Sequence, residues 1–375
     1  MIIECITASI ALLEQNRVCW WEKDISPTLI TQAGITTIKA CAYADTCLAL
    51  TEDGLILFAM SPSKFELSPT DVTACICNIL GISSTSEIIE IDVAFWKVIV
   101  VTEYVISIIE IRYDEVLEPI AVCKYHTMID LFAISGNQIV YRTDRRLYVI
   151  GGYAKEPERI VYDEDTVVNI KEIVCDLLHI FLVMNDGSVL ECPHYYYKSG
   201  SYKAARLIEF PEAVVITKLT VGAHFALCLD SNGSCWDIYP DAPGHDHSLL
   251  TRRILREYTV TRLFITTNYI VVLCEDGQQL LTTLDKLRSI LTVSGSYTTI
   301  TSWPLLDIEI TAAVESSFDL YLTTTDSQVY VCANQDNKPC LRLMPFFVDH
   351  PIAIRDRSMA IRSASSVLRG TCFQV

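Results

Sequence analysis

The sequence lacks the motifs by which common enzyme classes are recognised. It has no glycine-rich phosphate loop, no Gly-x-Ser-x-Gly nucleophile elbow and no His-Glu-x-x-His zinc motif. Cys75-x-Cys77 and Cys192-x-His194 each stand without a second pair at the spacing of a zinc site. We therefore expect a non-catalytic protein that holds no cofactor and no metal ion.

The sequence also lacks a long uncharged apolar run. Its most apolar region, Ile88–Ile111, is interrupted by charged residues, and a membrane-spanning helix needs about 20 consecutive apolar residues. The first residues, Met1–Gln15, carry Glu4 and no basic leader, so no secretory signal is expected. These features predict a protein of the cytoplasm, the nucleus or both, without membrane contact.

Basic residues are scarce, with 29 Lys and Arg against 46 Asp and Glu, which gives a net charge of −17. Direct binding of nucleic acid or anionic lipid depends on basic residues and is not expected. A protein partner is compatible with this charge, and a basic partner would be steered towards the chain. The basic stretches Arg142–Arg146 and Thr251–Arg256 are interpreted as solvated turns. A monomer is expected.

The 15 cysteines are an odd number in a long chain, and most stand inside short apolar runs. This pattern indicates buried thiols in a reducing compartment rather than disulfides. Sustained apolar stripes with a helical period of 3.6 residues are missing, so few helices are expected.

What the sequence does contain is a repeated hairpin, best preserved at Thr46–Ala59, TCLALTEDGLILFA. Two alternating apolar runs flank an Asp-Gly pair, which is typical of two antiparallel strands joined by a tight turn. Gly54 is needed there because the turn places a residue at positive φ. The same spacing of apolar residues recurs around Gly187, Gly233 and Gly277.

Weaker copies of this hairpin occur where a period of about 44 residues predicts them. Asn16, Val105, Arg145 and Ser327 take the place of the turn glycine in these copies. Each copy follows another apolar strand and precedes a further short one, so each unit would form a four-stranded sheet. The predicted upstream strands include Ile38–Ala40, Ile91–Ala94, Ile170–Ile173, Lys218–Val221 and Ile308–Ile310.

Such sheets have two apolar faces and stack radially as the blades of a β-propeller. We predict an all-β fold in which residues 1–375 form one propeller domain. Seven blades are expected, with eight as the alternative, and a β-sandwich or a linear solenoid would be the competing folds. Strands from both termini, including Pro351–Val375, are expected to close the ring and remove exposed sheet edges.

Two stretches, Leu48–Gly54 and Val221–Trp236, carry a family resemblance. Their order of apolar strand, small residue or His, Leu-x-Leu, Asp-Gly or Asn-Gly turn and aromatic residue resembles the repeat of the RCC1-like (regulator of chromosome condensation) propellers. His179 and His224 stand near the His position of that repeat, and Gly151 keeps its closing glycine. WD40 propellers are the rival family, since their period fits as well and the chain contains one Trp-Asp pair.

The resemblance implies a protein-interaction propeller. It also implies an alternative function, guanine-nucleotide exchange on a Ran-like small GTPase, although no loop matches an exchange motif of the family. The His179 and His224 side chains are interpreted as structural, with hydrogen bonds to blade backbone. For Trp20 and Trp21, a place in the blade core and a place on the surface both remain open.

The most distinctive surface candidate is the segment His194–Lys203, HYYYKSGSYK, because tyrosine offers large contact area at low entropic cost. Asp241–His247, DAPGHDH, could hold a divalent cation but is interpreted as a solvated loop. The predicted partner-binding residues are Tyr195, Tyr196, Tyr197, Lys198, Tyr202 and Lys203.

Overall fold

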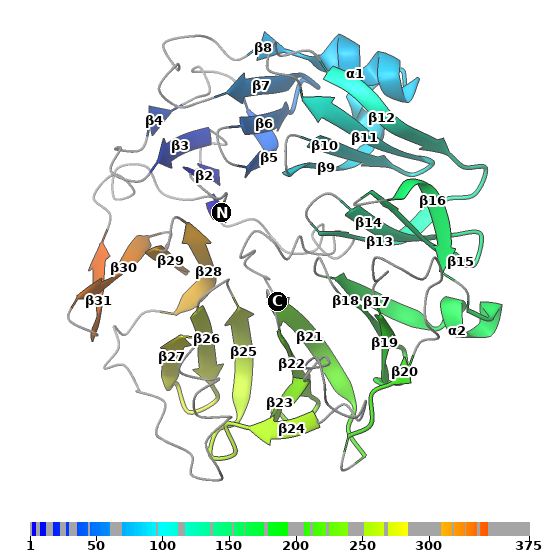
Figure 1. The fold of residues 1–375 in the computed structure, drawn as a ribbon. Helices are drawn as coiled ribbons and strands as arrows, with labels where there is room; N and C mark the ends of the chain where they lie inside the picture. Colours follow the sequence, from blue (N-terminus) through cyan, green and yellow to red (C-terminus); the bar gives the residue numbers. More distant parts are fainter. Residues whose placement is uncertain are drawn as a thin grey trace.

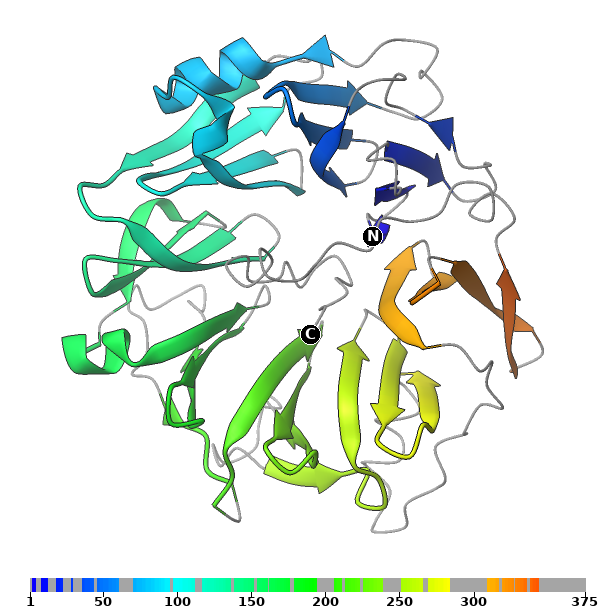
Figure 2. The same cartoon turned by 180° about the vertical axis from the view of Figure 1, so that it is seen from behind.

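The computed structural model of the chain is a ring of small antiparallel β-sheets around a central axis (Figures 1 and 2). The predicted all-β propeller is therefore confirmed. The structure describes residues 2–4, 8–12, 18–22, 28–29, 36–43, 46–60, 70–94, 97–111, 117–135, 138–151, 154–160, 162–175, 179–193, 206–210, 213–222, 225–238, 251–265, 269–283, 309–316, 319–326, 328–335 and 338–343.

The described strands form eight sheets, seven of four strands and one of three. The first four sheets comprise β1 (Ile2–Glu4), β2 (Ala8–Leu12), β3 (Val18–Glu22) and β4 (Thr28–Leu29); β5 (Thr37–Tyr43), β6 (Thr46–Thr51), β7 (Ile56–Met60) and β8 (Thr70–Asp71); β9 (Ile88–Ala94), β10 (Lys97–Thr102), β11 (Val105–Ile111) and β12 (Leu117–Lys124); β13 (Ile129–Ser135), β14 (Gln138–Thr143), β15 (Arg146–Gly151) and β16 (Ala154–Ile160).

The other four sheets comprise β17 (Ile170–Cys175), β18 (His179–Met184), β19 (Val189–Pro193) and β20 (Arg206–Leu207); β21 (Ile216–Gly222), β22 (Phe225–Asp230), β23 (Cys235–Ile238) and β24 (Thr251–Ile254); β25 (Val260–Ile265), β26 (Tyr269–Cys274) and β27 (Gln279–Thr283); β28 (Ile310–Ser316), β29 (Asp319–Thr324), β30 (Val329–Gln335) and β31 (Lys338–Leu343). Each hairpin copy counted in the sequence supplies one sheet, so the described strands make eight blades, the number held as the alternative.

Every sheet is an antiparallel meander of consecutive strands, with the first strand nearest the ring axis (Figure 1). The N-terminal strand β1 lies beside β28, so the ring closes where the first and last sheets meet. None of the described sheets mixes strands from the two ends of the chain. The segment Pro351–Val375, from which closing strands were expected, lies outside the described residues.

The glycine turns are confirmed. Gly54, Gly187, Gly233 and Gly277 have φ values of 83°, 83°, 73° and 81°. Each glycine N–H donates to the carbonyl three residues earlier, at 3.0 to 3.1 Å. A Cβ is disfavoured at such φ values, which explains why the best copies of the repeat keep glycine at this point.

Two copies without glycine are built differently. β10 and β11 are joined by Glu103-Tyr104, and β14 and β15 by Asp144-Arg145. Val105 is therefore the first residue of β11 and not a turn residue, because this connection is two residues shorter than a glycine turn. Arg145 does lie in its turn, with φ of 53°.

An irregularity near the start of the first strand recurs around the ring and was not predicted from the sequence. In seven sheets the register between the first two strands shifts by one residue at this point, as between Thr37 and Lys39. Such a bulge bends the strand and increases its twist.

Two short helices were not expected from the apolar periodicity. α1 (Thr73–Leu80) precedes β9, and α2 (Glu164–Val168) precedes β17. Asp163 caps α2, and its carboxylate accepts hydrogen bonds from the backbone N–H and the hydroxyl of Thr166, both at 2.7 Å. Helices of five to eight residues have too few turns to produce a sustained stripe.

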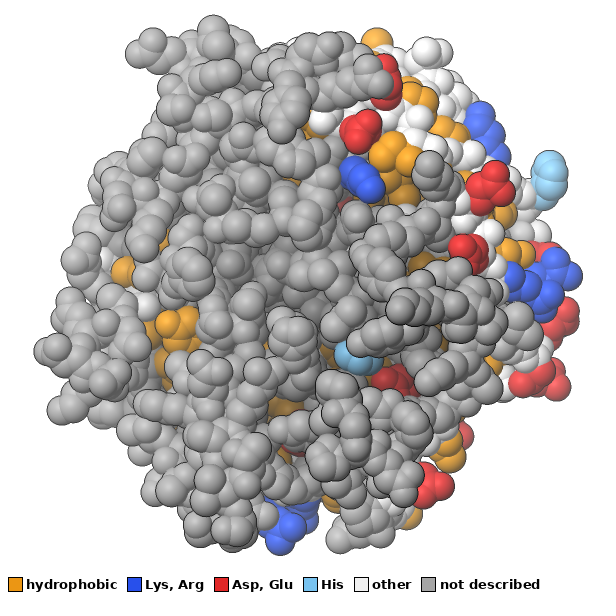
Figure 3. Space-filling model, in the orientation of Figure 1, with side chains coloured by type: hydrophobic (Ala, Val, Ile, Leu, Met, Phe, Trp, Pro, Cys, Tyr) orange, Lys and Arg blue, Asp and Glu red, His pale blue; other side chains and the backbone are white. Residues whose placement is uncertain are grey.

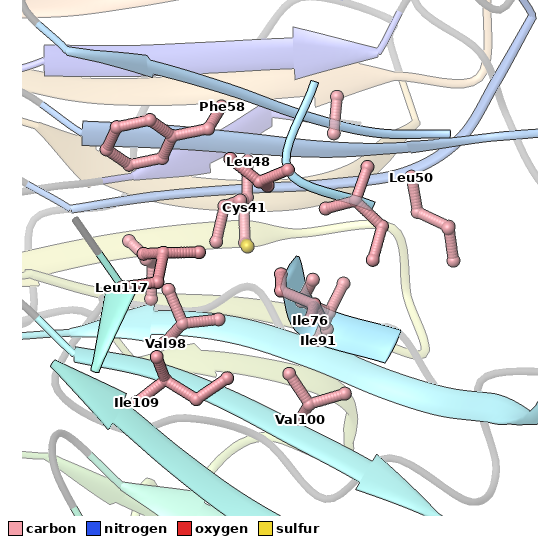
Figure 4. Packing of buried hydrophobic residues seen from close by; sticks show 14 of the residues in the cluster. Cys41, Leu48, Leu50, Phe58, Ile76, Ile91, Val98, Val100, Ile109 and Leu117 are labelled. Carbon is pink, nitrogen blue, oxygen red and sulfur yellow. The ribbon is translucent and has the colours of Figure 1, made fainter. Parts of the chain in front are cut away.

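The core is divided among the spaces between neighbouring sheets. Figure 4 shows one of them, where Leu48 and Phe58 of one sheet face Val98 and Ile109 of the next. Ile76 of α1 is fully buried in the same cluster. Since each sheet packs its two faces on its neighbours, no single sheet has a core of its own.

Candidate functional site

The connections between strands fall on two faces of the ring. Because the strands of each meander alternate in direction, the turns between second and third strands lie on the same face as the connections from one sheet to the next. We call this the hairpin face. The connections between first and second strands, and between third and fourth strands, lie outside the described residues.

The predicted partner-binding residues fall among these other connections. Tyr195, Tyr196, Tyr197, Lys198, Tyr202 and Lys203 stand in the sequence between β19 and β20, outside the described residues, and stay a prediction. The same holds for Asp241–His247 and for His224. His179 begins β18, and its ring lies 6.1 Å from that of Phe181. Trp20 and Trp21 lie in β3, and their side chains are outside the described part.

Hydrogen bonds join the hairpin turns to the following sheet, and we call them junction bonds. The carbonyl of Gly187 accepts from the N–H of Ile216 at 3.0 Å, and the carbonyl of Gly233 from the N–H of Val260 at 2.8 Å. At the Gly54 turn the donor is the Thr85 hydroxyl, at 2.8 Å. These bonds fix the turns in place relative to the next blade.

The two shorter turns differ in their junction bonds, since only the first makes the bond through its own backbone. The Glu103 carbonyl accepts from the N–H of Ile129 at 2.7 Å. After β13–β16 the donor is a side chain: Arg142 donates to the carbonyls of Val167 and Ile170 at 3.0 and 2.9 Å. The same guanidinium donates to both carboxylate oxygens of Asp130, at 2.9 and 3.0 Å.

The hairpin face carries exposed apolar side chains. Tyr104, Met128, Val168 and Val215 are 47%, 38%, 41% and 50% exposed. Exposed carboxylates surround them, because six of the described turns contain one: Asp53, Glu103, Asp144, Asp186, Asp276 and Asp326. In the space-filling view, apolar, acidic and basic side chains of described residues lie together over β9–β16 (Figure 3).

Charged residues also recur near the starts of the first strands. Lys39 pairs with Glu90, and Arg262 with Glu309 at 3.5 Å, each across a boundary between sheets. Burial raises the pKa of Glu90, and the Lys39 ammonium opposes that rise. The pKa of Glu172 is likewise raised by burial and opposed by the Lys218 charge. These ion pairs join residues of neighbouring sheets.

A tyrosine cluster lies between β9–β12 and β13–β16. Tyr141 and Tyr148 stack with ring centroids 5.6 Å apart, and the Tyr125 and Tyr141 hydroxyls share a hydrogen bond. Burial raises the pKa of Tyr125 to about 12 and that of Tyr141 further. The phenols therefore stay protonated at neutral pH and act as packing groups.

The cysteines follow the expected pattern, since eight of those described are buried. Burial raises the pKa of Cys192 to about 12 and that of Cys274 to about 11, so neither is a thiolate at neutral pH. Cys75 and Cys77 lie on α1 as free thiols.

Among the described residues, no group of three or more His, Cys, Asp or Glu side chains could hold a metal ion. None of the described helices is long and apolar enough to cross a membrane.

The residues that give the hairpin face its character were missed by sequence reasoning. Tyr104 and Met128 are isolated apolar residues without a motif, and their exposure depends on how three connections meet. The Arg142–Arg146 stretch offered a usable signal, because it places Arg at a glycine position, but it was interpreted as an ordinary solvated turn.

Comparison with known proteins supports the fold and does not assign a family. No family model and no curated protein matches the sequence. Among solved structures, the chain is similar to BamB from Moraxella catarrhalis, with a TM-score of 0.51 and 12% identity over 88% of this chain and 92% of that one.

RCC1-like propellers are also among the similar structures. Yeast RCC1 (Prp20) has a TM-score of 0.45 and 11% identity over 82% of this chain and 76% of that one. Human WBSCR16 has a TM-score of 0.46 and 12% identity over 74% of this chain and 83% of that one. At these identities the likeness is one of fold: a ring of antiparallel sheets.

Proposed function

We propose that the chain is a non-catalytic interaction scaffold that binds a partner protein on its hairpin face. One observation carries the proposal: four large apolar side chains are exposed there on backbone that hydrogen bonds hold in place. Apolar groups exposed on fixed backbone favour binding, because burying them releases water while little further ordering is required.

The fixed backbone is clearest around two valines. Val168 ends α2, and the following Asn169 carbonyl accepts from the N–H of Asn185 at 2.9 Å. The Val215 carbonyl accepts from the N–H of Ser231 at 2.9 Å. The exposed carboxylates of Asp163 and Asp186 lie in the same part of the face, and hydrogen bonds from Thr166 and Ser188 lower the pKa of each. This part of the face suits a basic partner, which the net charge would steer.

The test compares proteins that co-purify with three forms of the chain from its native source. The double substitution Val168→Ser and Val215→Ser should lose proteins that the wild type retains. Ile120→Ser, in β12, is the matched control, because Ile120 is 40% exposed and lies on an outer strand. Retention of the same proteins by the wild type and the double variant would contradict the proposal, as would recovery of no partner by the wild type.

The second candidate is nucleotide exchange on a Ran-like GTPase. It is favoured by the likeness of Leu48–Gly54 and Val221–Trp236 to the RCC1 repeat. Release of labelled GDP from such a GTPase, measured with and without the chain, tests it. A release rate that stays at background would remove this candidate and leave the scaffold proposal in place.

A further inference from the structure

One pair of facing positions on the first two strands is reversed in β13–β16. In five other sheets the residue just after the bulge is charged, and its partner on the second strand is apolar. These pairs are Lys39 and Leu50, Glu90 and Val101, Glu172 and Val183, Lys218 and Leu229, and Arg262 and Leu273. In β13–β16 the first strand has Leu131 and the second has Arg142. The charge therefore stands one strand further from the ring axis (Figure 1).

From this place the Arg142 side chain reaches the segment that joins α2 to β17. The side chain is only 15% exposed. Its Nε and Nη2 atoms donate to the two carboxylate oxygens of Asp130, at 2.9 and 3.0 Å. These two bonds fix the plane of the guanidinium. The remaining nitrogen, Nη1, then donates to the carbonyls of Val167 and Ile170, at 3.0 and 2.9 Å.

These two carbonyls lie on either side of Val168, the residue that α2 exposes on the hairpin face. Val168 is 41% exposed, whereas Val167 and Ile170 are buried. The Asn169 carbonyl between them accepts from the N–H of Asn185 at 2.9 Å. A helix of five residues has little stability of its own. The position of Val168 therefore depends on one side chain from the preceding sheet.

Val215, the other valine of the proposed interface, is held by bonds between backbone groups. Its carbonyl accepts from the N–H of Ser231 at 2.9 Å. The next residue, Ile216, donates its N–H to the Gly187 carbonyl at 3.0 Å. The two valines thus stand on one face with different supports, a side chain for the first and backbone for the second.

We propose that Arg142 is a positioning residue for partner binding. It holds the backbone on both sides of Val168, so that the partner meets this side chain in one fixed orientation. The guanidinium is mostly buried and acts through the carbonyls of Val167 and Ile170. Without it, this segment would have to be ordered when the partner binds, and that ordering costs affinity. The inference rests on the proposed scaffold function and names a residue that controls one half of its interface.

Amide hydrogen exchange on the full chain gives the first test and needs no partner. In Arg142→Met, the amides of Val167 and Asn169 should exchange about tenfold faster than in the wild type, because the segment loses two of its bonds. The amides of Ile216 and Ser231 should exchange as in the wild type, since their partners are backbone groups. Unchanged exchange at Val167 and Asn169, or an equal increase at Ile216 and Ser231, would overturn the inference.

Co-purification from the native source gives the second test. The proteins that Val168→Ser fails to retain should be recovered with Arg142→Met in about fivefold lower amount than with the wild type. Val272→Ala is the control, because it removes buried apolar atoms between β21–β24 and β25–β27 and should lower stability to a similar extent. It should retain these proteins in full. Full recovery with Arg142→Met, or an equal loss with Val272→Ala, would overturn the inference and leave the proposed function in place. The Val168 and Val215 experiment reports separately on that function.

Discussion

The sheets β13–β16 and β17–β20 attach to their following neighbours by opposite means. After β17–β20 the turn itself makes the junction bond, through the Gly187 carbonyl and the Ile216 N–H. After β13–β16 a strand residue makes it, through the Arg142 guanidinium and two carbonyls of the next blade. In the first case the turn carbonyl is the acceptor and a backbone N–H of the next sheet is the donor. In the second case the donor is a side chain of β14, and the acceptors are carbonyls that lie before and at the start of the next sheet.

The two modes of attachment place different constraints on the residue that can stand in the hairpin turn. A Cβ built on Gly187 would lie 2.5 Å from the Val215 Cγ1 and 3.0 Å from the Ile216 nitrogen, so the turn is confined to glycine. In β13–β16 the junction no longer depends on the turn, and the turn residue can vary. Arg145 stands at the turn position that Gly187 occupies in the following sheet.

Gly187→Ala should give the largest effect. The left-handed φ and the clash with backbone of the next sheet together should lower the free energy of unfolding by about 3 kcal/mol. Gly277→Ala is the control, because its φ is alike but no described atom lies within 4 Å of its added Cβ. It should lose only about 1 kcal/mol. Equal losses in denaturant titrations would show that the neighbouring sheet plays no part.

Arg142→Met should follow, with a loss of about 2 kcal/mol, because two carbonyls lose a charged donor while the apolar part of the side chain is kept. Urea unfolding measures it. Arg159→Met is the control, since Arg159 is exposed on β16. If both variants unfold at the same urea concentration, the guanidinium does not stabilise this junction.

Thr85→Val should cost about 1 kcal/mol, because it removes the hydroxyl that donates to the Gly54 carbonyl. Thr85→Ser keeps a hydroxyl and should retain most of the stability. Thermal unfolding of the pair, followed by circular dichroism, decides the matter. A valine variant as stable as the wild type would show that the Thr85 hydroxyl does not stabilise this junction.

Asp130→Asn should have the smallest effect, about 0.5 kcal/mol, since the Asp130 side chain is 47% exposed and water screens its pairing with Arg142. The loss should shrink further at high salt. The Gly187→Ala loss should not change with salt, because it involves no charged group. A salt-independent loss in Asp130→Asn would indicate that the carboxylate acts by hydrogen bonding alone.

The sequence predicted the parts of the fold that one residue type enforces. Gly54, Gly187, Gly233 and Gly277 were assigned correctly, because positive φ excludes most other residues and leaves a local pattern. The strand that should have started at Ile308 begins at Ile310 instead. Such boundaries depend on pairing between strands and leave a weaker local trace than a turn does.

Features that depend on two sheets could not be predicted in this way. The Gly187 carbonyl and its partner Ile216 are backbone groups, and any residue supplies them. The Arg142 contacts join positions 25 and 28 residues apart in sequence, with no motif at either end. The exposure of Tyr104 follows from such contacts, which explains why the candidate site emerged from the structure and the turns from the sequence.

The described strands of each sheet come from one continuous stretch of chain. Among the described strands, the meeting of β1 and β28 is therefore one boundary between sheets like the others. A ring of this kind has no preferred starting point, so it is suited to circular permutation at a hairpin turn. It can also gain or lose a blade by duplication or deletion of one unit, since no other sheet would be left with a missing strand.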